Sequence, residues 1–226
     1  MEFTFQERLS DAPFVERVWR TESHRAGSFI SAAASQWEIV VTTYLGKTAL
    51  TLRGPATKAS PADFPADAEF FGIVFKLGTF MPNLPTVNRR DRNDLTLPEA
   101  SSKSFWLDSM VWQLPNFDNA DTFVNRLVHN NLLAYDPIVD TVLQDRAHTL
   151  SARALQYRFL RATGLTHKIV QQIKRAHLAR SFLVQGAPIL DTVFEVGYFD
   201  QAHLTNSLRR FIGQTPGQIA RTVQPQ

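Results

Sequence analysis

The feature that most constrains this chain is a pair of similar segments in about its last 75 residues, lying about fifty positions apart. Each combines a helix, a tight turn and a second helix, and the second helices are predicted at Ser151–Gly164 and Asp200–Gly213. In both, Ser or Asp stands at the N-cap position and Gly stands where the helix ends. Because large apolar residues return every fourth position, one face of each helix is predicted to be core.

The opposite face of each second helix carries side chains that can read base edges or grip phosphate. In the first helix these are Arg153, Gln156, Tyr157, Arg158 and Arg161, and in the second they are Gln201, His203, Thr205, Asn206, Arg209 and Arg210. We expect Arg153, Gln156 and Tyr157 in one major groove, and Gln201, Asn206 and His203 in the next; Lys168, Arg158, Arg209 and Arg210 are expected to contact phosphates. A solvated surface is the alternative for either helix alone, but two such units in tandem favour DNA binding.

The segment between the two units predicts a rigid helix. No Gly or Pro interrupts the chain from about Thr166 to Val184, and apolar residues return every three or four positions. About 19 helical residues span about 28 Å, which suits successive major-groove faces about 34 Å apart. After Gly186, a short helix is predicted over Ile189–Val196 and a final one from Pro216, where proline can occupy the first helical position.

From about Leu150 to Arg221 this chain resembles the AraC family of bacterial transcription regulators. The matching positions are Ser151, Leu155, Phe159, Gly164, Arg175, Ala176, Ala179, Ile189, Gly197, Tyr198, Leu208, Gly213, Thr215 and Pro216. The most specific part is the run from Gly197 to Leu204 followed by Gly213–Pro216. The resemblance implies an α+β chain: a β-rich N-terminal regulatory domain over 1–133 and an all-α DNA-binding domain over 134–226, whose two helix-turn-helix units are joined by a long linker helix.

The chain departs from the family pattern at several positions. Tyr157 and Asn206 stand where the family usually has Arg, so we expect altered DNA specificity. Gln144 and Asp145 replace the usual Leu and Ala, so the helix supporting the first reading helix is expected to be short and to end by about Arg146. A ligand-binding or scaffold protein that has lost DNA affinity is the alternative that these changes leave open.

Net charge is distributed unevenly along the chain, as expected for such a regulator. From residue 137 onward there are 11 Lys and Arg against 5 Asp and Glu, a net charge of +6, whereas residues 1–136 carry −3. A basic part beside an acidic part is expected when only one of them contacts phosphates. The absence of cysteine excludes disulfides, zinc fingers and thiol chemistry. No apolar run reaches membrane-spanning length and no signal peptide is recognised, so a cytoplasmic protein is expected.

The N-terminal part is predicted to be β-rich with a helical tail. Strands are predicted at Gln36–Leu45, Lys47–Arg53 and Glu69–Lys76, loops at Gly54–Pro65 and Met81–Asp94, and helices at Ser104–Trp112 and Asn119–Leu133. The last helix, around Phe123 and Leu127, is a candidate contact for a homodimer. The first two strands meet at Gly46, which predicts a hairpin.

Six aromatic residues could line an apolar pocket for a small-molecule effector, although a core role is favoured for them: Trp19, Trp37, Phe71, Phe75, Phe80 and Trp106. A metal site is not expected, because only His24 and His129 lie in this part and they are far apart in sequence. No phosphate loop, nucleophile elbow or metalloprotease motif is present. We therefore expect no cofactor and no catalysis, while an enzyme acting through the N-terminal part is a further alternative.

Overall fold

The computed structural model describes residues 3–91 and 93–221, and a β-rich N-terminal part precedes a helical C-terminal part, as predicted. The chain forms two compact units. The first contains the residues up to 28 together with 36–55 and 63–167. The second contains 29–35, 56–62 and the chain from 168 onward. The predicted division between residues 133 and 134 stays a prediction, and the compact units divide the chain at other places.

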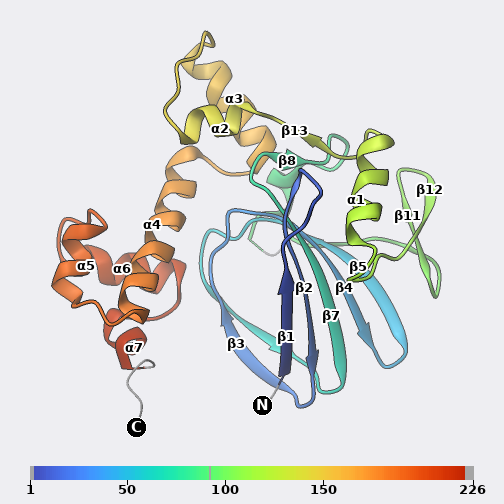
Figure 1. Ribbon diagram of the computed structural model, residues 1–226, viewed down its shortest axis with the longest axis horizontal. Helices are drawn as coiled ribbons and strands as arrows, with labels where there is room; N and C mark the ends of the chain where they lie inside the picture. Colours follow the sequence, from blue (N-terminus) through green and yellow to red (C-terminus); the bar gives the residue numbers. More distant parts are fainter. Residues whose placement is uncertain (1–2, 92, 222–226) are drawn as a thin grey trace. The chain divides into compact units, whose positions relative to one another are not determined.

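The first unit is built on an antiparallel six-stranded sheet (Figure 1). Its strands, in spatial order, are β1 (Phe3–Arg8), β2 (Val15–Ser23), β7 (Ala68–Phe75), β4 (Glu38–Tyr44), β5 (Lys47–Arg53) and β9 (Leu95–Thr96). One cross-strand row, Val18, Ile73, Ile39 and Leu52, is almost completely buried. Because alternate residues of a strand share a face, this row fixes which side of the sheet faces the core.

Two glycines have positions in this sheet that a side chain would disturb. The β4–β5 hairpin predicted at Gly46 is confirmed, and its turn residues Leu45 and Gly46 have φ values of 49° and 71°. Positive φ at both central residues matches the twist that a two-residue hairpin needs. Gly72 lies opposite Trp19, where an added Cβ would come within 2.2 Å of the indole ring.

The predicted helix over Ser104–Trp112 is wrong, because this segment forms the hairpin of β11 (Ser104–Leu107) and β12 (Met110–Gln113). Phe105, Leu107 and Trp112 are buried while Trp106 is 45% exposed, which is the alternation of a strand. The turn residues Asp108 and Ser109 both have positive φ, which no helix permits. β10 (Glu99–Ser101) adds a third strand beside this hairpin.

The helix predicted over Asn119–Leu133 is confirmed as α1 (Ala120–His129). Phe123 and Leu127 are buried in the core of the first unit, and the Phe123 ring meets Phe105 and Trp112 edge-on. These two side chains therefore cannot form a dimer contact, while a contact through the exposed face of α1 stays a prediction. Their burial against the β11–β12 hairpin leaves them no surface to offer to a second chain.

Several short elements were not predicted. The segment Gly54–Pro65, expected to be a loop, contains β6 (Ser60–Phe64), which pairs with β3 (Gly27–Ser31). The expected loop Met81–Asp94 contains a short 3-10 helix, η1 (Thr86–Arg89). The remaining pair is β8 (Thr79–Phe80) with β13 (Ala134–Tyr135).

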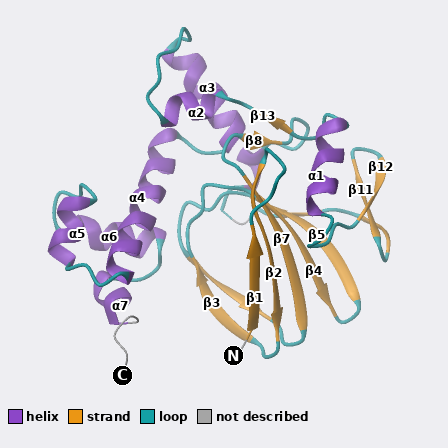
Figure 2. Cartoon of the chain, in the orientation of Figure 1, coloured by secondary structure: helices purple, strands orange, loops and turns teal. Residues whose placement is uncertain are grey.

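The C-terminal part is helical, and Figure 2 shows its helices in purple. They are α2 (Ile138–Leu143), α3 (Ala152–Thr163), α4 (His167–Val184), α5 (Ile189–Glu195), α6 (Gln201–Phe211) and α7 (Pro216–Arg221). The long linker helix and the short helices around it are confirmed, and α2 is short as expected. The supporting helix gives way to a loop by about Arg146, as expected: residues 144–151 form a connection longer than the tight turn first expected in this unit, and Asp145 in it has positive φ.

Candidate nucleic-acid interface

The first reading helix, α3, is delimited by the residues predicted to cap it. Ser151 Oγ accepts a hydrogen bond from the Ala154 amide at 3.3 Å. Gly164, at φ 72°, ends the helix, and its amide donates to Leu160 O. Because L-residues other than glycine rarely adopt positive φ, the glycine stops the helix here. Phe159 lies on the buried face, as its four-residue spacing from Leu155 predicted.

Of the predicted contact residues on α3, Arg153, Gln156, Tyr157 and Arg161 are exposed, Tyr157 to 66%, and Arg158 is half-buried. Arg158 instead makes a two-pronged ion pair with Asp136, with Nε–Oδ2 at 3.0 Å and Nη2–Oδ1 at 2.6 Å. This hydrogen bonding raises the pKa of Arg158. A phosphate that bound Arg158 would have to compete with a carboxylate in bidentate geometry.

Arg161 is also engaged within the first unit. Its guanidinium carbon lies 5.4 Å from the centre of the Phe80 ring, close enough for a cation–π contact. Phe80 belongs to β8, so the last turn of α3 rests against the β-rich part of the same unit. Two of the three arginines expected to face DNA from α3 are thus in contact with other groups.

The second reading helix, α6, begins with a shorter capping bond. Asp200 accepts the His203 amide at 2.7 Å. A carboxylate at this end is also favoured by the helix dipole. Leu204, Leu208 and Phe211 form its buried face, as the spacing of the first two predicted.

The other face of α6 is open. Gln201, His203, Asn206, Arg209 and Arg210 are exposed, while Thr205 is half-buried and its hydroxyl donates to Gln201 O. The His203 ring packs edge-on against Tyr198 at 5.1 Å, so His203 also has a structural role. Burial raises the pKa of Tyr198, whose hydroxyl forms a hydrogen bond with Ser207 Oγ.

The cations of the second unit differ from those of α3. Lys168, in the first turn of α4, and Arg209 are exposed, and neither has a hydrogen bond or ion pair among the residues that the structure describes. The Arg210 guanidinium lies 4.9 Å from the centre of the ring of its neighbour Phe211, and it has no ion pair within the described part of the chain. These side chains are available to an anionic partner.

Sequence reasoning missed Asp136 as the partner of Arg158. The two residues are 22 positions apart, and no periodicity links them. Asp136 also accepts the Ile138 amide, so it organises the start of α2 as well as holding α3. The change in net charge from residue 137 onward was the one signal at this place in the sequence.

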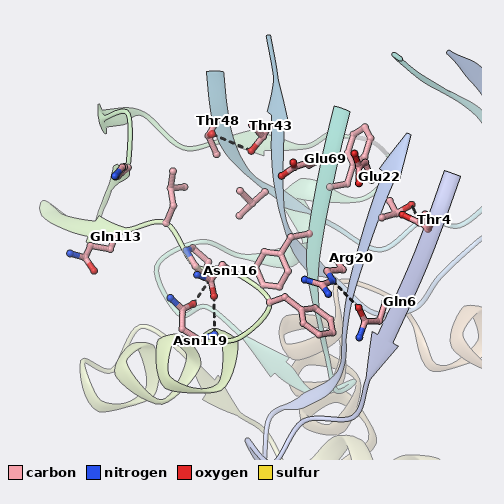
Figure 3. Close-up of a pocket in the computed structure, with 18 of the residues that line it drawn as sticks. Thr4, Gln6, Arg20, Glu22, Thr43, Thr48, Glu69, Gln113, Asn116 and Asn119 are labelled. Carbon is pink, nitrogen blue, oxygen red and sulfur yellow. Dashed lines mark hydrogen bonds between the residues drawn. The ribbon is translucent and has the colours of Figure 1, made fainter. Parts of the chain in front are cut away.

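A second candidate site is an open cavity of about 1160 Å³ on the sheet of the first unit (Figure 3). One polar row crosses five strands at its rim and consists of Thr4, Glu22, Glu69, Thr43 and Thr48. The next row inward, Gln6, Arg20, Phe71 and Val41, is partly apolar. The segment from Gln113 to Phe117, with Asn119, lines the cavity as well.

The cavity is not the aromatic pocket that the sequence suggested. Of the six predicted aromatic residues, only Phe71 is among the residues that line it. Trp37 and Phe75 are buried core residues whose rings stack at 4.1 Å, which confirms the favoured core role for them. Trp106 is largely exposed.

Within residues 3–91 and 93–221, no group of three or more His, Cys, Asp and Glu is arranged to hold a metal ion. In the same residues no helix has both the length and the apolar character needed to cross a bilayer.

Comparison with known families identifies the C-terminal segment. Residues 146–222 match the model of a helix-turn-helix domain family, and this domain is of the AraC type. It contains both α3 and α6, together with the linker helix α4. Such domains are the DNA-binding parts of transcription regulators. No curated protein matches the chain.

Among solved structures, the chain is similar to ToxT from Vibrio cholerae. One ToxT structure shares 8% identity at a TM-score of 0.41, covering 98% of this chain and 99% of that one. Another, bound to (E)-4-(8-methylnaphthalen-1-yl)but-3-enoic acid, shares 10% identity at a TM-score of 0.40, covering 98% of this chain and 100% of that one. Similarity this low carries no conclusion about the ligand or the mechanism of the present chain.

Proposed function

Because residues 146–222 form a helix-turn-helix domain of the AraC type, we propose that the protein is a sequence-specific transcription regulator that inserts α3 and α6 into adjacent major grooves. The observation that carries the proposal is the design shared by the two helices. Each is capped at its start, buries an apolar stripe and exposes polar side chains on the other face. The helices of helix-turn-helix proteins read base edges with such a face.

Roles for individual residues follow from their chemistry and exposure. Asn206 carries an amide that can pair with adenine through two hydrogen bonds, and Gln156 offers the same groups on α3. Gln201 and His203 lie in the first turn of α6, the part of a reading helix that contacts bases. Arg209, Arg210 and Lys168 supply positive charge for phosphates, which position the protein without reading sequence.

We also propose that the cavity on the β-rich sheet binds a small-molecule effector. The open cavity of about 1160 Å³ is larger than the roughly 300–1,000 Å³ of ordinary small-molecule sites, so a metabolite would fill part of it, against a lining that mixes polar and apolar groups. The Arg158–Asp136 and Arg161–Phe80 contacts connect α3 with other parts of the unit that contains this cavity, to which α3 also belongs. An effector that altered this unit could thereby change how α3 presents its side chains.

The test is selection of bound duplexes from a randomised DNA pool with the full chain, followed by affinity measurements across a salt series. We expect the selected duplex to carry two short elements about one helical turn apart, and its affinity to fall steeply with salt. A scrambled duplex is the control. Absence of any enrichment, with metabolite mixtures present as well as absent, would reject the proposal.

The second candidate function is a ligand-binding protein without DNA affinity. The observation that favours it is the engagement of Arg158 and Arg161, together with Tyr157 and Asn206 at positions where relatives usually have arginine. It predicts that no duplex is enriched under any condition of the selection, and that any residual binding to DNA changes little with salt.

A further inference from the structure

Two segments of the N-terminal sequence are part of the second compact unit. Residues 29–35 and 56–62 pair with each other through Ala34 and Ala56, whose amides and carbonyls form two hydrogen bonds. In sequence each segment lies between strands of the β-rich sheet. In the structure they nevertheless lie in the same compact unit as α4 and α6, and specific polar contacts hold them there.

Each of the two segments donates a backbone amide to one of the last carbonyls of α6. The Ala33 amide donates to Phe211 O at 2.7 Å, and the Ala59 amide donates to Arg210 O at 2.7 Å. His177 of α4 adds a third bond, in which its Nε2 lies 2.7 Å from Ala33 O. The last carbonyls of a helix have no partner within the helix. The two segments therefore complete the C-terminal end of the second reading helix.

The packing around these bonds is close. Gly213 follows α6 at φ 79°, and an added Cβ there would come within 2.4 Å of the Ile30 side chain and 3.1 Å of the Ala59 Cβ. A glycine is required here both by the backbone conformation and by the neighbouring segments. The position of residues 56–62 against α6 is thus fixed by hydrogen bonds and by shape.

This arrangement brings one lysine to the end of α6. Lys58 directly precedes Ala59 in the chain, so its backbone lies one residue from the hydrogen bond to Arg210 O. The side chain is exposed, and it has no hydrogen bond or ion pair among the residues that the structure describes. It joins Arg209 and Arg210, which are exposed at the same end and likewise have no acidic partner there.

We propose that Lys58 is a phosphate contact of the DNA-binding surface, delivered to the end of α6 by residues 56–62. The proposal rests on the proposed function and extends the interface beyond the helix-turn-helix domain into the N-terminal sequence. Lys58 adds a third exposed positive charge at the end of the helix that carries Arg209 and Arg210, which strengthens the attraction of this surface for an anion. The C-terminal end of a helix also attracts cations and not anions, so a phosphate at this place requires side chains such as these.

The test compares Lys58→Ala with Lys47→Ala in the full chain. Lys47 is an exposed lysine in the β4–β5 hairpin of the other unit, so both variants lose the same charge. We expect Lys58→Ala to weaken binding to specific and scrambled duplexes alike, by about three- to tenfold, and to reduce the salt slope by about one. Lys47→Ala is expected to match the wild type. Identical affinities and slopes for the two variants would overturn the proposal.

Two further proteins separate the possible failures. Arg209→Ala tests the end of α6 itself: if it weakens binding while Lys58→Ala does not, the proposed function stands and the role of Lys58 is rejected. If the wild type binds no duplex, both proposals fail. Ala59→Pro removes the amide that donates to Arg210 O but retains the lysine at position 58, and we expect it to release residues 56–62 from α6 and so to reproduce the smaller salt slope of Lys58→Ala. Thermal unfolding verifies that each variant is folded.

Discussion

The two reading helices, α3 and α6, come from the same sequence pattern and differ in what surrounds them. Each has a capping residue, a buried apolar stripe and basic residues near its end. On α3, Arg158 is held by Asp136 and Arg161 lies over Phe80. On α6, Arg209 and Arg210 are exposed without an acidic partner in the described part of the chain.

The difference shows that caps, apolar spacing and basic residues do not reveal which side chains of a helix are free to contact DNA. The contacts of α3 come from the β-rich unit, whereas α6 is completed by two short segments that bond to its backbone and leave its side chains open. We therefore expect α6 to supply most of the affinity for DNA. In this view α3 contributes mainly through Arg153, Gln156 and Tyr157; Arg161 is exposed as well, but its guanidinium lies over the Phe80 ring.

The largest expected effect comes from removing phosphate contacts in pairs. Arg209→Ala with Arg210→Ala should weaken binding to every duplex by at least on the order of tenfold and reduce the salt slope by about two. The matched pair Arg153→Ala with Arg161→Ala should reduce it by about one, because Arg161 lies over Phe80 of β8, outside its own helix, whereas the ring that Arg210 contacts belongs to its neighbour on α6. Affinities measured across a salt series decide this. Equal losses from the two pairs would remove the distinction between the helices.

Base reading gives the next comparison. Asn206→Ala should cost about 1–3 kcal/mol at one base pair and leave other positions of the operator unchanged, because a bidentate amide contact discriminates adenine. Gln156→Ala should do the same at a base pair in the other half of the operator. Binding to a panel of single-base operator variants measures both. A loss spread evenly over all sequences would assign the residue to the backbone instead.

The capping residues test the stability of the two helices. Asp200→Ala should lower the free energy of unfolding by about 0.5–2 kcal/mol, near the upper end because a carboxylate also interacts with the helix dipole. Ser151→Ala should lie near the lower end, since its bond to the Ala154 amide is 3.3 Å long. Urea unfolding of both variants gives the values. A larger loss for Ser151→Ala would contradict the ranking.

A similarly small effect on stability is expected from the ion pair between Arg158 of α3 and Asp136. Asp136→Asn should cost about 1 kcal/mol or less, because solvent screens the Arg158 side, whose side chain is 42% exposed, and Asn keeps an oxygen that can accept the Ile138 amide at the 13% exposed Asp136 side. DNA affinity should rise at the same time, because Arg158 becomes free to meet a phosphate. Asp145→Asn, an exposed loop residue, is the control. Unchanged affinity in Asp136→Asn would mean that Arg158 faces no DNA.

Much of the helical part was predictable because its signals are local. Caps, glycine stops and apolar spacing lie within a few residues of one another, so α3, α4 and α6 follow from the sequence. Sequence reasoning failed where the pairing is distant or the strands are short. β11 and β12 have only four residues each, and their aromatic residues satisfied a helical pattern as well as an alternating one.

The features of the candidate site also fall into those that local sequence predicts and those that depend on distant contacts. The exposure of Gln156, Asn206 and Arg209 follows from helix periodicity, and these residues lie on open faces. The pairing of Arg158 with Asp136, the packing of Arg161 on Phe80 and the place of Lys58 depend on tertiary contacts between distant positions. Whether a basic side chain is free to bind an anion depends on the residues packed around it, and helix periodicity does not identify those residues.

The pairing of residues 29–35 and 56–62 with the end of α6 has a consequence for modularity. The second compact unit is assembled from three separate stretches of sequence. A chimera that joins this C-terminal region to another sensor by a single crossover would leave Phe211 O and Arg210 O without their amide donors. An exchange of this unit between relatives would have to transfer the two short stretches together with the helices. Recombination that preserves the unit therefore needs more than one breakpoint.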